Sequence, residues 1–142
     1  MSLRPSLTIL LGFILLSGCG LWPDQEQSPP AQDENARIVA DLGRQWRALP
    51  RVSTVEAGYL DDTDNVPGIK AEIVCRGCDV DTIGEGVVAD VWSSRLSPLS
   101  GINVHVVDDG TGQEFRGYYA TVRDEAELSE NYGERPAGTT LD

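Results

Sequence analysis

The sequence predicts an α+β domain, a two-layer αββαββ sandwich in which two helices cover one face of a four-stranded antiparallel sheet. Three observations point to this fold. Two segments carry apolar residues at three- and four-residue steps, as amphipathic helices do, and four segments alternate between apolar and polar residues, as half-buried strands do. These elements follow in the order helix, strand, strand, helix, strand, strand. The halves also echo each other, because each helix carries a late tryptophan (Trp46, Trp92) and is followed by a proline (Pro50, Pro98).

The first helix opens a folded domain that we expect to span residues 35–128. Asp33 or Asn35 has the side chain needed to cap its start. Pro50 ends the helix because a proline ring breaks the helical hydrogen-bond pattern. The predicted apolar stripe consists of Ala36, Val39, Leu42, Trp46 and Leu49.

Two strands and the second helix follow. Residues 52–60 and 69–75 alternate in polarity, and the acidic segment 61–68 between them has the composition of a turn, which predicts a hairpin. The second helix then begins after the second cysteine of the domain, with Asp81 as its expected cap. Its predicted apolar face consists of Ile83, Val87, Val91 and Trp92.

A second hairpin and a tail complete the chain. Residues 102–107 and 115–122 read as strands, and the glycine-rich segment 108–112 reads as the turn between them. The chain from Asp124 onward contains six acidic residues and one arginine. We expect it to begin as a short helix and to continue as an acidic, flexible tail over residues 129–142.

The charge balance excludes two classes of partner. The chain contains 23 acidic and 11 basic residues and has a formal net charge of -12. Phosphate backbones and anionic lipid head groups repel such a surface, since both are bound through clustered lysine and arginine. We therefore expect no nucleic-acid partner and no membrane binding through a basic face.

The amino terminus has the features of an export signal. Arg4 supplies a positive start, and residues 7–16 form an apolar run that is shorter than the roughly 20 residues of a spanning helix. The next residues, Leu16-Ser17-Gly18-Cys19, closely resemble the lipobox of bacterial lipoproteins. The resemblance implies that residues 1–18 are a signal peptide, that the bond before Cys19 is cut, and that the Cys19 thiol carries a diacylglyceryl group.

The segment after Cys19 reads as a tether. Residues 19–34 are rich in proline, glutamine and acidic residues, a composition that does not build a core. This layout resembles that of small lipoproteins of Gram-positive bacteria. It implies a protein anchored in the cell membrane through lipid on Cys19, with its domain on the extracytoplasmic face.

Cys75-Arg76-Gly77-Cys78 is the compact motif of the mature chain. With Cys19 lipidated, Cys75 and Cys78 form an even pair, and such pairs oxidise outside the cytoplasm. A turn through Gly77 brings the two α-carbons within bonding range, so a structural disulfide is the favoured interpretation. A thioredoxin-like redox pair stays open, because a strand precedes the motif and a helix follows it. A zinc site lacks its further ligands.

Other residues that carry chemistry offer weaker candidates. The turn residues Asp61, Asp62 and Asp64, and likewise Asp108 and Asp109, are close enough in sequence to share a cation weakly, although turn formation and solubility also explain them. His105 lies on the polar side of a predicted strand and belongs to no recognisable nucleophile motif. The sequence therefore indicates no catalytic site and no cofactor.

Two classes of function remain open at this point. The first is a non-catalytic binding or envelope-interaction module with a protein partner in the cell envelope. The second is an extracytoplasmic thiol–disulfide protein that uses Cys75 and Cys78.

Overall fold

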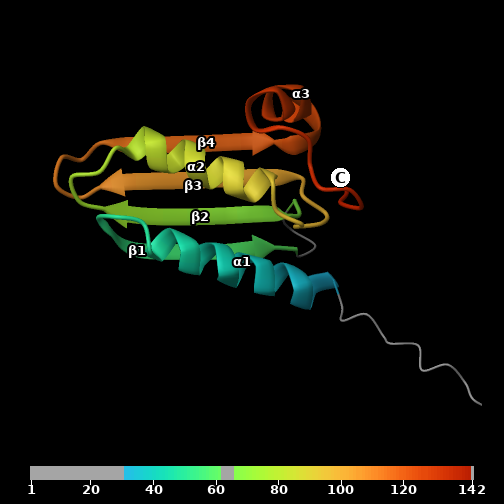
Figure 1. Cartoon of the computed structure of the whole chain (residues 1–142), viewed down its shortest axis with the longest axis horizontal. Coiled ribbons are helices and arrows are strands. Elements are labelled where there is room, and N and C mark those ends of the chain that lie inside the picture. Colours follow the sequence, from blue (N-terminus) through green and yellow to red (C-terminus); the bar gives the residue numbers. More distant parts are fainter. Residues whose placement is uncertain (1–30, 62–65, 142) are drawn as a thin grey trace, which may run out of the picture.

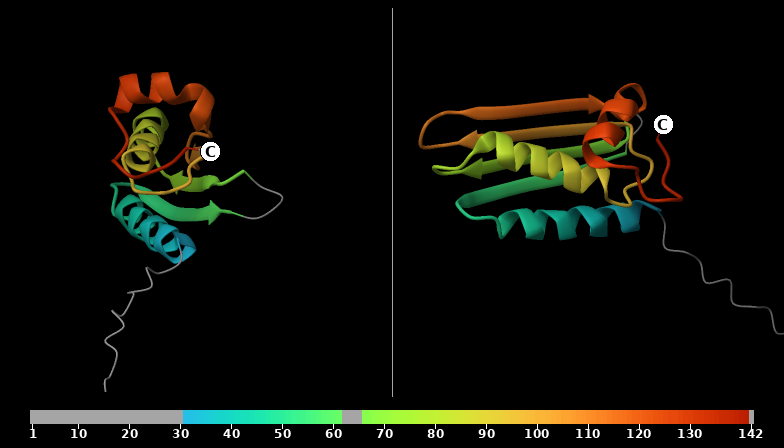
Figure 2. Two further views of the ribbon diagram at one scale, coloured as in Figure 1. Left: turned by 90° about the vertical axis from the view of Figure 1, so that its right-hand side faces the viewer. Right: turned by 45° about the horizontal axis from the view of Figure 1, so that its top comes forward.

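The computed structural model describes residues 31–61 and 66–141, and this part of the chain forms three helices and four strands. Helices α1 and α2 lie on one face of the sheet, and α3 packs beside β4 and α2 (Figures 1 and 2). The predicted α+β class is confirmed. The elements are α1 (Ala31–Arg47), β1 (Val52–Leu60), β2 (Gly68–Cys75), α2 (Val80–Trp92), β3 (Gly101–Asp108), β4 (Glu114–Ala120) and α3 (Thr121–Tyr132).

The sheet has the order β1-β2-β3-β4, and its central pair differs from the prediction. Strands β1 and β2 are antiparallel, as are β3 and β4, but β2 and β3 run parallel. The expectation of a fully antiparallel sheet is therefore wrong in this detail. The reason is that α2 crosses the sheet once. A helix of its length spans about 20 Å, close to the length of a strand, so it returns the chain to the edge from which β2 began.

The parallel pair also shows that the sequence similarity between the two halves does not produce two equivalent structural units. Because β2 and β3 run the same way, β1 and β3 run in opposite directions, and the halves are not two copies stacked side by side. Their tryptophans are both 1% exposed but have different partners. Trp46 Nε1 donates to Asp90 Oδ2 at 2.9 Å, whereas Trp92 Nε1 donates to the carbonyl oxygen of Gly133 at 2.7 Å.

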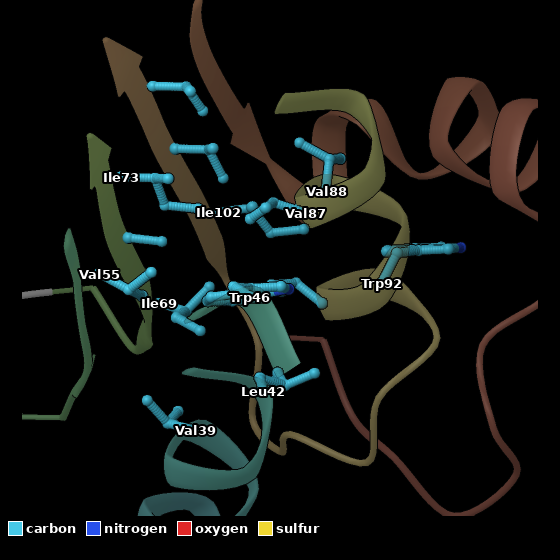
Figure 3. Close-up of a cluster of buried hydrophobic side chains, with 14 of the residues drawn as sticks. Val39, Leu42, Trp46, Val55, Ile69, Ile73, Val87, Val88, Trp92 and Ile102 are labelled. Carbon is cyan, nitrogen blue, oxygen red and sulfur yellow. The ribbon is translucent and has the colours of Figure 1, made fainter. Parts of the chain in front are cut away.

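The core lies between the sheet and the helices. Alternate residues of β2 and β3 point into it, and their neighbours on the other face are partly or fully exposed. Leu42 and Trp46 of α1 and Val87 and Val88 of α2 belong to this core (Figure 3). The strand residues that complete the centre of this core are Ile69, Ala71, Ile73, Ile102, Val104 and Val106.

The helix starts differ from the predicted caps. Helix α1 begins at Ala31, before the expected start of the domain at residue 35. Asn35 is therefore inside the helix and does not cap it. Its buried amide instead donates to the Ser97 carbonyl oxygen at 2.9 Å and accepts from the Ser97 amide at 3.1 Å. The cap of α2 is Asp79, not Asp81, and its carboxylate accepts from the amides of Asp81 and Thr82.

The carboxyl-terminal segment is held against the domain. Helix α3 continues to Tyr132, so the boundary expected at residue 129 falls inside it. Beyond the helix, the Arg135 guanidinium lies 5.2 Å from the Trp92 ring centre and donates to the carbonyl oxygens of Trp92 and Leu96. Thr140 then exchanges hydrogen bonds with the loop after α2, including one from the Leu99 amide to its carbonyl oxygen at 3.1 Å.

Candidate functional site

Cys75 and Cys78 are joined by a disulfide at the junction of β2 and α2. Their α-carbons lie 6.0 Å apart. The turn between them passes through Gly77, whose φ of 66° is in the left-handed region that glycine adopts without strain. Cys75 ends β2 and is fully buried, whereas Cys78 is partly exposed just before the cap of α2. The disulfide thus fixes the end of a central strand to the start of the helix that crosses the sheet.

The cysteine turn is docked on the β3–β4 turn by two aspartates. The buried Asp108 carboxylate accepts from the amides of Gly77 at 3.0 Å and Gly110 at 2.8 Å, and these hydrogen bonds lower its pKa. Arg76 forms a two-bond ion pair with Asp109 at 2.9 and 3.0 Å, and this contact lowers the pKa of Asp109. Both predicted cation candidates in this turn therefore already have partners within the protein.

The surroundings of the disulfide disfavour exchange chemistry. Because Cys75 is buried, an attacking thiolate reaches the sulfur of Cys78, and Cys75 has to leave as a buried thiolate. Burial destabilises a thiolate, and the guanidinium of Arg76 is already paired with Asp109. This arrangement favours a disulfide that stabilises the fold.

The remaining acidic turn lies at the other end of the sheet. Asp61 follows the end of β1, where Leu60 pairs with Gly68, whereas Asp108 pairs with Cys75 at the opposite end of β2. Asp62 and Asp64 lie outside the described residues. Within residues 31–61 and 66–141, no group of three histidine, cysteine or acidic side chains is arranged to hold a metal ion.

The sheet face away from the helices carries charges that pair with one another. Across the strands, Glu72 lies beside His105, and His105 beside Arg116. Lys70 forms an ion pair with Glu72 at 2.8 Å and lowers its pKa. Glu114 forms an ion pair with Arg116 at 2.7 Å, and this contact lowers the pKa of Glu114. Glu114 also lies 3.4 Å from His105 Nε2. His105 thus lies among ion pairs on this face of the sheet.

A groove of about 780 Å³ runs between α1 and β1. The helix contributes the small residues Ala36, Ala40 and Gly43, and the strand contributes residues 57–59. Ala36 was predicted to belong to the buried stripe, but it is exposed at this groove. Leu49, predicted as the last member of that stripe, is 37% exposed after the helix end. Sequence reasoning missed the groove, although the small residues at steps of four and three beside Val39 and Leu42 were its visible signal.

Three arginines from α1 line this groove, a local concentration of positive charge on an acidic chain. Arg47 donates to the carbonyl oxygen of Val55 at 3.2 Å, and Arg44 pairs with Asp41. Arg37 forms no ion pair with any residue of the described chain. The groove therefore combines an apolar floor with a rim of three arginines and two aspartates, Asp41 and Asp61.

Comparison with known protein families, with curated proteins and with solved structures found no match to this chain. Among the helices that the structure describes, none has the length and hydrophobicity to cross a bilayer.

Proposed function

We propose that the chain is an exported lipoprotein, held on the extracytoplasmic face of the cell membrane by lipid on Cys19, and that its domain is a non-catalytic binding module. The disulfide between Cys75 and Cys78 is the observation that carries this proposal. Disulfides persist in oxidising compartments outside the cytoplasm. That compartment agrees with the export signal and the lipobox of residues 16–19.

A binding role is favoured over catalysis by the way the reactive groups are used. The sulfur of Cys75 is buried, Asp108 holds two backbone amides, and His105 lies beside the ion pair of Glu114 and Arg116. The groove between α1 and β1, in contrast, is open and bears Arg37, which has no acidic partner within residues 31–61 and 66–141. The partner we expect is a protein of the cell envelope.

The lipid anchor is tested by Cys19→Ala in a bacterial host supplied with a labelled fatty acid. The substitution removes the thiol that accepts the lipid, so the variant should carry no label and should keep its signal peptide. Ser17→Ala is the matched control, because it leaves a small residue at its lipobox position and should be labelled and cut normally. Normal labelling of Cys19→Ala would contradict the proposed anchor.

A further inference from the structure

Helix α1 overhangs the edge of the sheet. Helix α2 packs across both β3 and β4, whereas α1 packs chiefly on β1, the edge strand (Figures 1 and 2). A helix is about 10 Å wide and strands lie about 4.8 Å apart, so one helix covers two strands. The outer half of α1 therefore covers a strand position that no described residue fills. The groove lies at this position, and the small residues Ala36, Ala40 and Gly43 keep it open.

The backbone of β1 can accept a further strand at this edge. The Val55 carbonyl oxygen points away from β2, because it accepts from Arg47. The Cys75 carbonyl oxygen points toward β3, because it accepts from the amide of Asp109. In the register of β1 with β2, this direction agrees with a Val55 carbonyl that points away from β2. Backbone groups alternate in direction along a strand, so the amide and carbonyl of Ala57 also point into the groove. Among the described residues, no strand pairs with that edge of β1.

The charges of the groove specify the partner further. Arg37, Arg44 and Arg47 line it together with Asp41 and Asp61, so the lining keeps one positive charge in excess on a chain with a formal net charge of -12. Arg37 has no acidic partner among the described residues, and its long side chain can reach a ligand that lies along the helix. Carboxylates are the groups that such guanidinium side chains bind best in an extended peptide.

We propose that an extended, acidic segment of another protein binds in this groove as a fifth strand beside β1, beneath α1. Main-chain hydrogen bonds to β1 would supply the pairing, and the arginines of α1 would select acidic side chains. This inference specifies the partner of the proposed binding module. It does not depend on the lipid at Cys19.

Neither a second copy nor the amino-terminal segment of this chain fits this position well. Pairing β1 with its equivalent in a second copy places a two-fold axis beside the strand. Each α1 overhangs the outer edge of its own β1. In such a dimer the axes of the two α1 helices would therefore lie closer than the roughly 8–10 Å that packed helices need. In the segment before α1, Pro23, Pro29 and Pro30 have no amide hydrogen to donate to a neighbouring strand.

The first test uses the purified full chain in detergent micelles and an eight-residue peptide that alternates glutamate with valine. We expect saturable binding that salt weakens, and slower hydrogen exchange at the Ala57 amide, with no change at Glu56, whose amide faces β2. A peptide with lysine in place of glutamate should bind at least about tenfold more weakly. Binding with unchanged exchange at Ala57 would overturn the proposal, as would no binding at all.

Backbone methylation separates strand addition from adsorption by charge. One peptide is N-methylated at its valines and another at its glutamates, so that each loses the amide hydrogens along one edge. Strand addition predicts that one of the two, and only one, loses binding, because only one edge faces β1. Equal binding of both peptides would show adsorption by charge and would overturn the proposal.

Two matched pairs of variants locate the site. Ala40→Trp fills the groove and should weaken binding of the acidic peptide at least about tenfold, whereas Gln45→Trp, exposed elsewhere on α1, should not. Arg37→Glu should weaken it, whereas Arg95→Glu, exposed in the loop after α2, should not. Sedimentation at rising protein concentration gives the remaining outcome. If the protein forms a dimer that Ala40→Trp disrupts, the groove binds a second copy of the chain, and the proposal of an acidic segment is overturned.

Discussion

Asp108 has a different role from the other acidic side chains that the structure describes. It is 1% exposed, the only buried carboxylate among residues 31–61 and 66–141. Buried charges are tolerated where hydrogen bonds replace the lost water, and Asp108 receives the amides of Gly77 and Gly110. The residue therefore connects the cysteine turn to the β3–β4 turn, two segments far apart in sequence.

Asp108→Asn should lower the thermal midpoint of unfolding at pH 7 by several degrees, because the neutral amide is a weaker acceptor for the two backbone amides. Asp109→Asn is the control. It disrupts only an exposed ion pair and should have a smaller effect. Thermal unfolding followed by circular dichroism checks both variants. A larger loss for Asp109→Asn would contradict the role assigned to Asp108.

The same residue predicts a dependence on pH. The pKa of Asp108 is lowered in the folded protein, chiefly by the hydrogen bond from Gly77. Its contribution to stability is therefore complete above the unfolded pKa of about 3.9 and is lost as pH falls through the lower folded value. The difference in stability between the wild type and Asp108→Asn should shrink below about pH 4. An unchanged difference at about pH 3 would show that folding does not lower the pKa of Asp108.

At the scale of the elements, the predictions succeeded where the local pattern carries the information. Alternation in residues 69–75 and 102–107 identified both central strands and the residues that they bury. Strand direction is not encoded in that alternation. The single crossing by α2 determines it, because a helix that spans the sheet once returns the chain to the edge where the preceding strand began. The expected caps Asp81 and Asn35 are wrong, because several acidic or amide side chains stand near each helix start and only tertiary contacts decide between them.

The site was predictable to a similar extent. Counting cysteines led to the Cys75–Cys78 pair that the structure joins. The groove was missed because it depends on where α1 lies over the sheet edge, a property of the assembled layers. Ala36 illustrates this point, since it is apolar at a helical spacing and yet lies on the groove side of α1.

The disulfide joins two elements, so its removal should act on their connection. Replacing Cys75 and Cys78 by alanine should leave the domain folded but lower the free energy of unfolding by about 2 kcal/mol, from the entropy of closing so small a loop. Binding of the acidic peptide at the distant groove should survive. Denaturant unfolding measures the loss. Two free thiols in the exported wild type, or measurable disulfide-exchange activity, would favour the redox alternative instead.

For the molecule as a whole, both ends of the described chain meet at one loop. Asn35 of α1 holds Ser97 from one side, and Thr140 holds the same residue from the other. Arg135 adds hydrogen bonds to the same loop and lies over Trp92. The expectation of a free acidic tail does not describe residues 133–141, since backbone and side-chain contacts fix them to the domain.

A chain that ends at Gly133 should consequently be less stable by about 3 kcal/mol, since it lacks the contacts of Arg135 and Thr140. The loss should appear as a lower denaturant midpoint and as faster amide exchange at Ser97 and Leu99. A chain that ends at Leu141 lacks only Asp142 and should match the wild type. Equal stability of the two shortened chains would show that the segment only rests on the surface.

The parallel pair at the centre of the sheet also sets an order of events in folding. Strands β1 and β2, and likewise β3 and β4, are close in sequence, so each antiparallel pair closes over a small separation. Strands β2 and β3 are separated in sequence by α2 and its flanking loops, so their pairing closes a longer loop. Because closing a longer loop costs more entropy, this central pairing is the slow step. Shortening Val104 to alanine should therefore slow folding more than an equivalent change at the hairpin position Val55.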